Sequence, residues 1–282
     1  MSDVVGIGDF IPWDGGCLLI GRAVAVNPSH AHYAIQLAFG SEPGIRFRTD
    51  EREAWIEYDV VLIPSRQPHM MDGTRVVLDA VLFVEPETPQ GRALTERYPG
   101  GGIVALPREA LAGSAAALFG TWQAHGHGNA TIAAARDVVH ALTGGVRAAV
   151  VSDERIVRAI EYIRSHLGER LSLEDVAGAA CLSPSRFRHL FVEQTGTVLR
   201  SYVLWRRFLL AWEVVTRGGS LSTAAHTAGF ADAAHLTRTS HRMFGFAPSA
   251  MLVNVRTDWS TTGSERPPVT NLTTHRTRNR VG

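Results

Sequence analysis

The chain has 282 residues, which is enough for two domains of ordinary size. No run of about 18 apolar residues occurs, so we expect no membrane span and no membrane partner. The first residues lack the basic start and apolar core of a secretory signal. Cys17 and Cys181 do not suggest a disulfide framework, so the sequence predicts a cytoplasmic protein.

Charge is distributed unevenly along the chain. Residues 1–150 contain 11 Arg and 16 acidic residues, a balance of −5, whereas residues 151–282 contain 17 Arg and 11 acidic residues, a balance of +6. Lys is absent, so all 28 basic residues are Arg, whose guanidinium fork can bind a phosphate or a guanine edge through two hydrogen bonds. The basic half predicts a polyanionic partner.

The N-terminal part has the pattern of a β domain. Over residues 17–84, short runs such as CLLIGRAVAV, YAIQLAFG and RVVLDAVLFV are separated by turn sequences such as NPSH and SEPG. This predicts a small sandwich or barrel within residues 1–106. In residues 107–150, an Ala-rich segment and ATIAAARDVVHAL predict two helices separated by a loop at WQAHGHGN. These connecting helices could pack on the barrel or form a dimer interface.

From residue 153 onward the pattern is helical. DERIVRAIEYIRSHL places Ile156, Ile160 and Ile163 on one face, and the next helix begins with the spacing of a capping box. VLRSYVLWRRFLLAWEVVTRGG predicts one helix of about 20 residues, about 30 Å long. Residues 257–282 are rich in Thr, Arg, Pro and Asn and are expected to be disordered.

One pattern occurs twice in the basic half. SLEDVAGAACLSPSRFRHLFVEQTG at 172–196 is echoed by SLSTAAHTAGFADAAHLTRTSHRMFG at 220–245. Each copy predicts a short helix, a tight turn and a second helix, which is a helix-turn-helix. The long helix between the copies is close in length to the about 34 Å that separates successive major grooves on one face of DNA.

The second helix of each copy combines a narrow apolar face with an exposed polar face. The residues expected to face the core are Phe187, Leu190 and Phe191 in the first copy and Leu236, Met243 and Phe244 in the second. Any one of the exposed arginines could be an ordinary solvated charge, but the arrangement as a whole favours a DNA-reading surface. The residues expected to contact DNA are Ser185, Arg186, Arg188, His189, Arg206, Ala233, Ala234, His235, Arg238 and His241.

Residues 151–256 resemble the DNA-binding domain of the AraC/XylS family of bacterial transcription regulators, through LSPSRFRHLFVEQTG, YVLWRRFLLAWEVV, AAHTAGFADAAHLTRTSHRMFG and APSAM. The resemblance implies sequence-specific binding to double-stranded DNA at the bacterial nucleoid, a homodimer, and contact with RNA polymerase in an activator. Ser240 departs from the family, which usually has an aromatic residue there. The family's base-contacting positions fall on Ser185, Arg186, His189, Ala233, Ala234 and Arg238.

The first half resembles the cupin-like sensor domain that precedes this DNA-binding domain in the same family, through NPSHAHYAIQLAFG and EYDVVLIPSRQPHMM. His30, His32 and Gln36 fit the first cupin metal motif, with Gln36 in place of an acid, and His69 falls on a histidine of the second. Alternate residues of a strand share a face. These side chains could therefore hold Zn, Fe, Ni or Mn, line a metal-free effector pocket, or only hydrogen-bond inside the barrel.

The sequence thus predicts an α+β protein, with an N-terminal β-barrel, connecting helices and an all-α DNA-binding domain of two helix-turn-helix units joined by a long helix. We expect a transcription regulator without enzymatic activity or cofactor, controlled by a small-molecule effector or a protein partner. The alternative is a metal-dependent cupin enzyme with a DNA-binding module, which Gln36 disfavours. A DNA-alkylation repair protein would need a cysteine cluster, which Cys17 alone cannot supply.

Overall fold

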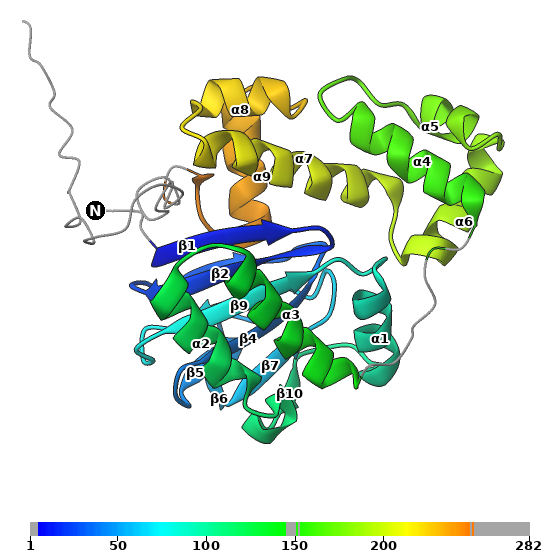
Figure 1. Cartoon of the computed structure of the whole chain (residues 1–282). Helices are drawn as coiled ribbons and strands as arrows, with labels where there is room; N and C mark the ends of the chain where they lie inside the picture. Colours follow the sequence, from blue (N-terminus) through cyan, green and yellow to red (C-terminus); the bar gives the residue numbers. More distant parts are fainter. Residues whose placement is uncertain (1–4, 145–150, 152, 249, 251–282) are drawn as a thin grey trace, which may run out of the picture.

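The computed structural model describes residues 5–144, 151, 153–248 and 250. A β domain is followed by helices that lie along its outer face, and then by an all-α domain above it (Figure 1). This confirms the predicted α+β fold with its N-terminal β domain and C-terminal helix-turn-helix units. The proposed tail at 257–282 lies outside the described residues. Within the described part of the chain, no helix has the length and apolarity needed to cross a membrane.

The β domain consists of two antiparallel sheets. A six-stranded sheet has the order β1-β2-β9-β4-β7-β10, and a four-stranded sheet has the order β3-β8-β5-β6. Their strands are β1 (Gly6–Trp13), β2 (Gly16–Ala23), β3 (Asn27–His30), β4 (Ile35–Gly40), β5 (Ile45–Arg48), β6 (Ile56–Tyr58), β7 (Val60–Ile63), β8 (His69–Asp72), β9 (Asp79–Val84) and β10 (Val104–Leu106). The inner faces meet in one apolar cluster, to which Phe47 and Met71 contribute from the small sheet and Val81 and Phe83 from the large one.

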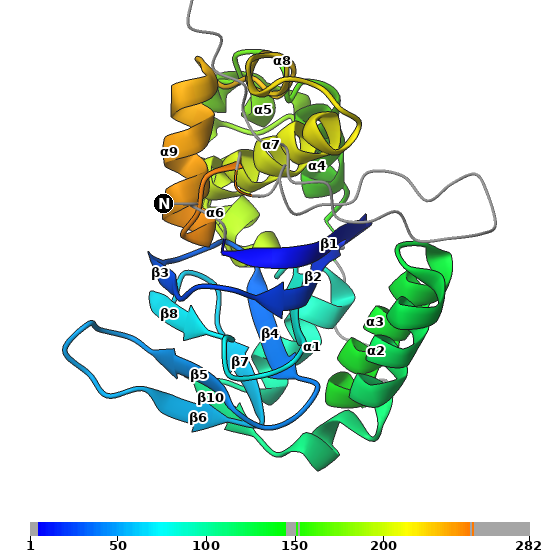
Figure 2. The same ribbon diagram turned by 90° about the vertical axis from the view of Figure 1, so that its left-hand side faces the viewer.

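The outer face of the six-stranded sheet is also apolar, because helices cover it (Figure 2). Leu18, Leu37 and Leu82 pack there against Leu118 and Val138 of two helices. Burial on both faces explains why β2, β4 and β9 are almost continuously hydrophobic rather than alternating. The helices and the 3-10 turn of this region are α1 (Pro89–Arg97), η1 (Arg108–Leu111), α2 (Ser114–His125) and α3 (Asn129–Thr143).

The connecting helices differ from the expected ones in two details. Ala112 and Gly113 adopt left-handed backbone angles, φ 46° and 81°, so the predicted first helix is divided into η1 and α2. Its second part runs on to His125, so the expected loop begins four residues late. Gly144, with φ 63°, ends α3 in the left-handed conformation.

The C-terminal domain contains two helix-turn-helix units at the two ends of one helix (Figure 1). Its helices are α4 (Glu154–Ser165), α5 (Leu173–Ala179), α6 (Pro184–Thr195), α7 (Leu199–Thr216), α8 (Leu221–Thr227) and α9 (Ala233–Phe244). Ser172 and Asp175 form the predicted capping box of α5. Gly196 and Gly245 end the two recognition helices, α6 and α9, in the left-handed conformation. The linking helix α7 has 18 residues, about 27 Å at 1.5 Å per residue.

Candidate nucleic-acid interface and buried histidine cluster

The recognition helix of the first unit, α6, is held by two aromatic side chains and exposes its polar face. Phe187 and Phe191 are fully buried, and the Phe191 ring lies 5.6 Å from that of Tyr202 on α7. His189 donates Nδ1–H to the Ser185 carbonyl at 2.9 Å. The four contact residues predicted on this helix are all exposed: Ser185, Arg186, Arg188 and His189.

The recognition helix of the second unit, α9, begins where the Asp232 side chain accepts a hydrogen bond from the His235 backbone N–H at 2.6 Å. Ser240, at the position where an aromatic residue was expected, is fully buried and donates its hydroxyl to the Phe246 carbonyl at 2.7 Å. The core therefore tolerates this polar side chain because its hydrogen bond is made. Ala234, Arg238 and His241 are exposed, whereas Ala233 and His235 are half-buried.

Arg206 lies in a different environment from the other predicted DNA contacts. It is on α7, its side chain is 18% exposed, and its guanidinium donates to Glu85 Oε1 at 2.8 Å. The same carboxylate oxygen accepts from Trp205 Nε1 at 3.0 Å. Because Glu85 is buried in the β domain, the Arg206 charge is already paired inside the protein. We therefore leave Arg206 out of the proposed DNA surface and assign it to the contact between the domains.

A second buried acid follows Glu85 closely. Glu87 accepts a hydrogen bond from the Tyr33 hydroxyl, and burial, together with the neighbouring Glu85, raises the pKa of Glu87 to about 8. The Tyr202 hydroxyl of α7 lies in the same group, and burial raises the pKa of Tyr202. Sequence reasoning missed both glutamates. Two acids that follow the apolar run at residues 80–84 were the signal, because such residues need a partner if the chain stays buried.

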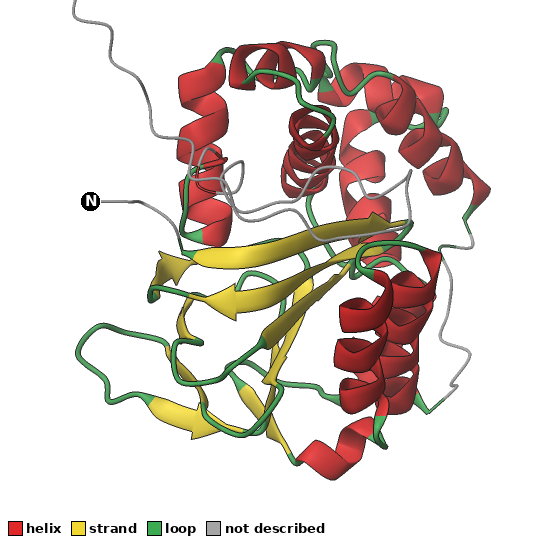
Figure 3. Ribbon diagram, turned by 60° about the vertical axis from the view of Figure 1, so that its left-hand side comes forward, coloured by secondary structure: helices red, strands yellow, loops and turns green. Residues whose placement is uncertain are grey.

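The two domains share one apolar core. Phe10 of β1 meets Trp212 of α7 with ring centroids 4.7 Å apart. Phe83, on the inner face of β9, lies 5.3 Å from Phe244 of α9 and 6.1 Å from Trp205 of α7. The C-terminal domain thus packs directly on the β domain (Figure 3), and a change in the β domain can reach the recognition helices through this shared core.

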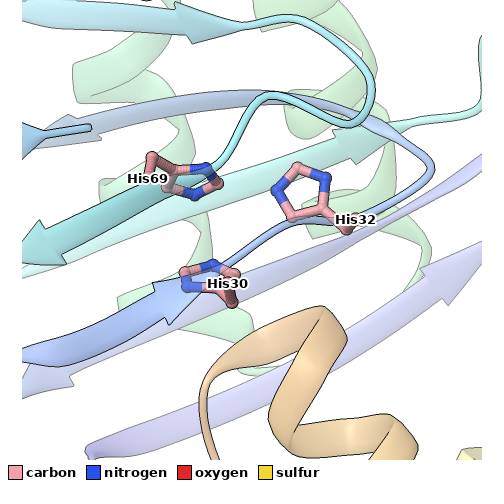
Figure 4. Close-up of side chains that lie close together, drawn as sticks. All are labelled: His30, His32 and His69. Atoms are coloured by element: carbon pink, nitrogen blue, oxygen red, sulfur yellow. The ribbon is translucent and has the colours of Figure 1, made fainter. Parts of the chain in front are cut away.

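The four residues of the predicted cupin-like set do come together. His30 ends β3 and pairs with His69 at the start of β8, while His32 follows β3 and Gln36 lies on β4 of the other sheet. The rings of His30 and His69 are 4.3 Å apart, and that of His32 is 5.9 Å from His30 and 5.2 Å from His69. All four side chains are buried, and the three rings surround a common space (Figure 4).

Backbone carbonyls fix the protons of these histidines. Nδ1 of His30, His32 and His69 lies 2.8, 2.7 and 2.9 Å from the carbonyl oxygens two residues away. A carbonyl can only accept, so each Nδ1 carries the proton. Burial lowers the pKa of His30 to about 3 and that of His32 to about 4, and it lowers the pKa of His69 as well. All three imidazoles are therefore neutral at neutral pH, with Nε2 free to donate an electron pair.

A separate cavity of about 120 Å³ lies between the β domain and the chain just after α9. Leu19, Val81 and Met71 from the inner sheet faces contribute to its lining, and Phe246 closes it from the C-terminal domain. Asp79 adds a carboxyl group that accepts the Ala23 N–H at 2.9 Å, and burial raises the pKa of Asp79 to about 7. A cavity of this size can hold a small apolar ligand.

Comparison with known proteins finds relatives of the helical half among transcription regulators. Residues 176–253 match the family of helix-turn-helix domains. The uncharacterized HTH-type transcriptional regulator YidL of Escherichia coli is 33% identical over 101 residues, and the arabinose operon regulatory protein of the same species is 32% identical over 99 residues. The matched segments cover 36% and 34% of this chain, and 34% of each relative. The chain thus spans about a third of the length of these relatives.

Solved structures extend the likeness to most of the chain. ToxT of Vibrio cholerae O395 superposes with a TM-score of 0.53 at 10% sequence identity, covering 84% of this chain and 96% of ToxT. The same protein bound to a methylnaphthalenyl butenoic acid gives a TM-score of 0.52 at 12% identity, covering 83% and 96%. At such low identity these matches establish only that this chain and ToxT share a two-domain fold.

The fold and these matches define a protein with an N-terminal β domain and a C-terminal domain of the helix-turn-helix class. Its C-terminal domain is similar in sequence to those of the E. coli regulator YidL and of the arabinose operon regulatory protein.

Proposed function

We propose that this protein binds specific double-stranded DNA through both recognition helices and regulates transcription from nearby promoters. The observation that carries the proposal is the placement of α6 and α9 at the two ends of the 18-residue helix α7. Both helices keep arginines on their exposed faces. A linker of about 27 Å suits two helices that enter successive major grooves on one face of DNA.

Control of DNA binding from the β domain is part of the same proposal. The cavity beside Phe246 could hold a small effector, and ToxT, which shares the fold, has been solved with an organic acid bound. A ligand in this cavity would contact both the sheet and the chain that follows α9, so it could favour one position of the second unit over another. The names of the relatives favour a regulator over an enzyme. Dimerisation through α2 and α3, and contact with RNA polymerase, remain proposals.

Selection of bound sequences from random DNA, followed by affinity measurements, tests this function. We expect enrichment of one motif with two half-sites, and binding that weakens steeply with salt because arginines displace counterions from phosphates. The matched variants are Arg186→Ala on α6 and Arg52→Ala, an exposed arginine on the β domain. The first should weaken specific binding and the second should leave it unchanged. Failure to enrich any sequence, or an affinity that does not respond to salt, would contradict the proposal.

A further inference from the structure

The histidine cluster contains hydrogen-bond acceptors that face one another. Nε2 of His32 and Nε2 of His69 carry lone pairs, because their protons are on Nδ1. Gln36 Oε1, which is also an acceptor, lies 2.8 Å from the first and 3.2 Å from the second. The amide nitrogen of Gln36 is buried without a hydrogen-bond partner. Acceptors this close repel one another unless a positive charge lies between them or the Gln36 amide is turned so that its NH₂ group donates.

The spacing of these atoms suits a shared metal ion. Ligand atoms bound at about 2.1 Å lie about 3.0 Å apart at right angles and about 3.4 Å apart at tetrahedral angles. The contact of Gln36 Oε1 with His69 Nε2, 3.2 Å, falls within this range, and its contact with His32 Nε2, 2.8 Å, is slightly shorter. One ring nitrogen of each histidine lies within 4.8 Å of the other two. The hydrogen bonds from each Nδ1 to a backbone carbonyl fix the orientation of the ring. Histidines that bind metals are oriented in the same way, by a hydrogen bond from the ring nitrogen that does not face the ion.

We propose that His30, His32, His69 and Gln36 bind one divalent transition-metal ion of the zinc, cobalt or nickel class, and that this ion fixes the contact between β3 and α9. Imidazole nitrogens suit these ions, whereas Mg²⁺ and Ca²⁺ prefer oxygen ligands. The consequence for DNA affinity rests on the proposed DNA-binding function, but the ion site and its coupling to α9 do not.

The coupling follows from the segment between two of the ligands. Ala31, between His30 and His32, donates its backbone N–H to the Arg242 carbonyl in the last turn of α9 at 3.1 Å. It thereby satisfies one of the carbonyls that a helix leaves unpaired at its C-terminus. A methyl group added at Gly245, the C-cap of α9, would lie 2.1 Å from Asn27 Oδ1, which shows how closely β3 and this helix end approach. An ion that draws His30 and His32 together must therefore act on α9.

The first unit is connected to the cluster by a lighter contact. Arg66 donates its backbone N–H to the His32 carbonyl at 2.8 Å, and its guanidinium donates to the Thr197 hydroxyl just after α6. In the second unit, the ring of Phe244 on α9 lies 6.4 Å from the ring of His32. The ion would hence stabilise the docked arrangement of both units, with the larger effect on α9. By linkage, DNA that prefers a different arrangement would weaken metal binding, and DNA that prefers the docked one would strengthen it.

Metal binding is measured on tag-free protein, by elemental mass spectrometry after purification and by titration of Zn²⁺ and Co²⁺. We expect about one ion per chain and visible absorption bands for the Co²⁺ form, with no response to Mg²⁺. His30→Ala should lose the ion, whereas His125→Ala, an exposed histidine outside the cluster, should keep it. If the wild-type chain carries no stoichiometric ion after purification and binds neither Zn²⁺ nor Co²⁺ in the titrations, the proposed metal site is wrong.

Gln36→Glu separates an ion site from a purely hydrogen-bonded cluster. A turned amide would donate its NH₂ group to both Nε2 atoms and need no ion, and a carboxylate would lose those donors. At a metal site the carboxylate adds a negative ligand, so Gln36→Glu should bind Zn²⁺ at least as tightly as the wild type. A folded Gln36→Glu variant that binds no metal would contradict the assignment, and this variant keeps the test independent of whether His30→Ala folds.

Hydrogen exchange tests the coupling without DNA. Zn²⁺ should slow amide exchange in residues 27–32 and 241–246 of the wild-type chain and leave His30→Ala unaffected. DNA affinity should change with Zn²⁺ by about fivefold or more. Metal binding without a change in exchange at 241–246 would overturn the coupling. Metal binding and protected exchange without any DNA binding would instead contradict the proposed function and leave this inference standing.

Discussion

The two helix-turn-helix units have the same architecture but different relations to the β domain. In the first, Phe191 packs inside the unit against Tyr202, and the polar face of α6 carries the long side chains Arg186 and Arg188. In the second, the position equivalent to Phe191 is Ser240. The aromatic side chain occurs one turn later, at Phe244, where it meets Phe83 of the β domain. The second unit thus shares its core with the β domain, whereas the first is largely self-contained.

This difference suggests a division of labour between the units. The first presents arginines and a histidine that can read bases, whereas the second presents Ala233 and Ala234 beside Arg238, which offer less discrimination. The second unit, however, ends against β3 and the histidine cluster. We infer that α6 contributes more to sequence specificity and that α9 carries the response to the β domain.

The largest effects on stability are expected from Phe244→Ala and Phe191→Ala, each of which removes one aromatic side chain from the core of one unit. Both rings are fully buried, so each truncation should cost about 3–5 kcal/mol of unfolding free energy. Only Phe244→Ala should also loosen the domains, seen as faster proteolysis between them and faster exchange in β3. Equal loosening by the two variants would show that both units pack on the β domain to the same extent, and would contradict the difference between them.

The DNA contacts should also separate the units. Arg186→Ala and Arg238→Ala should each cost about 1–3 kcal/mol on the selected site if the side chain reads a base. We expect the loss of specificity, measured against random DNA in the same salt, to be larger for Arg186→Ala. A larger loss for Arg238→Ala would reverse the assignment, and equal losses on specific and random DNA would indicate phosphate contacts only.

The interface between the domains should respond to pH through Glu87. Its pKa is raised in the folded protein to about 8 from an ordinary value of 4.5, so folding favours the protonated acid. Stability from this group is fully present below pH 4.5 and is lost as pH rises through 8. Glu87→Gln should therefore flatten the fall in stability over this range by a few kcal/mol. Chemical denaturation at several pH values measures it, and an unchanged slope would contradict the burial of a protonated Glu87.

The smallest expected effect concerns the turns of the two units. Cys181 in the first turn has φ 54°, and the equivalent residue of the second turn is Gly229, with φ 72°. Glycine adopts this conformation without strain, but it also makes the unfolded chain more flexible. We expect Cys181→Gly to stabilise the protein by up to about 1 kcal/mol, measured by thermal unfolding. A clear destabilisation would show that the thiol has a packing role.

Local patterns predicted much of this molecule. The repeat at 172 and 220, the capping box at Ser172 and the apolar faces of α6 and α9 lie within short windows, so periodicity and capping chemistry sufficed. The convergence of His30, His32 and His69 was available only through the resemblance to cupins. The pairing of Arg206 with Glu85 could not be predicted, because it joins residues 121 positions apart across two domains, and a surface arginine and a docked one look alike in sequence.

The central claim is that both recognition helices read DNA from one chain, and hydroxyl-radical footprinting on the selected site tests it most directly. The account predicts protection on one face of the duplex around two successive major grooves, about 34 Å apart. Arg186→Ala should weaken protection at one of them, and Arg238→Ala at the other. Protection confined to a single groove, or unaffected by either substitution, would contradict it.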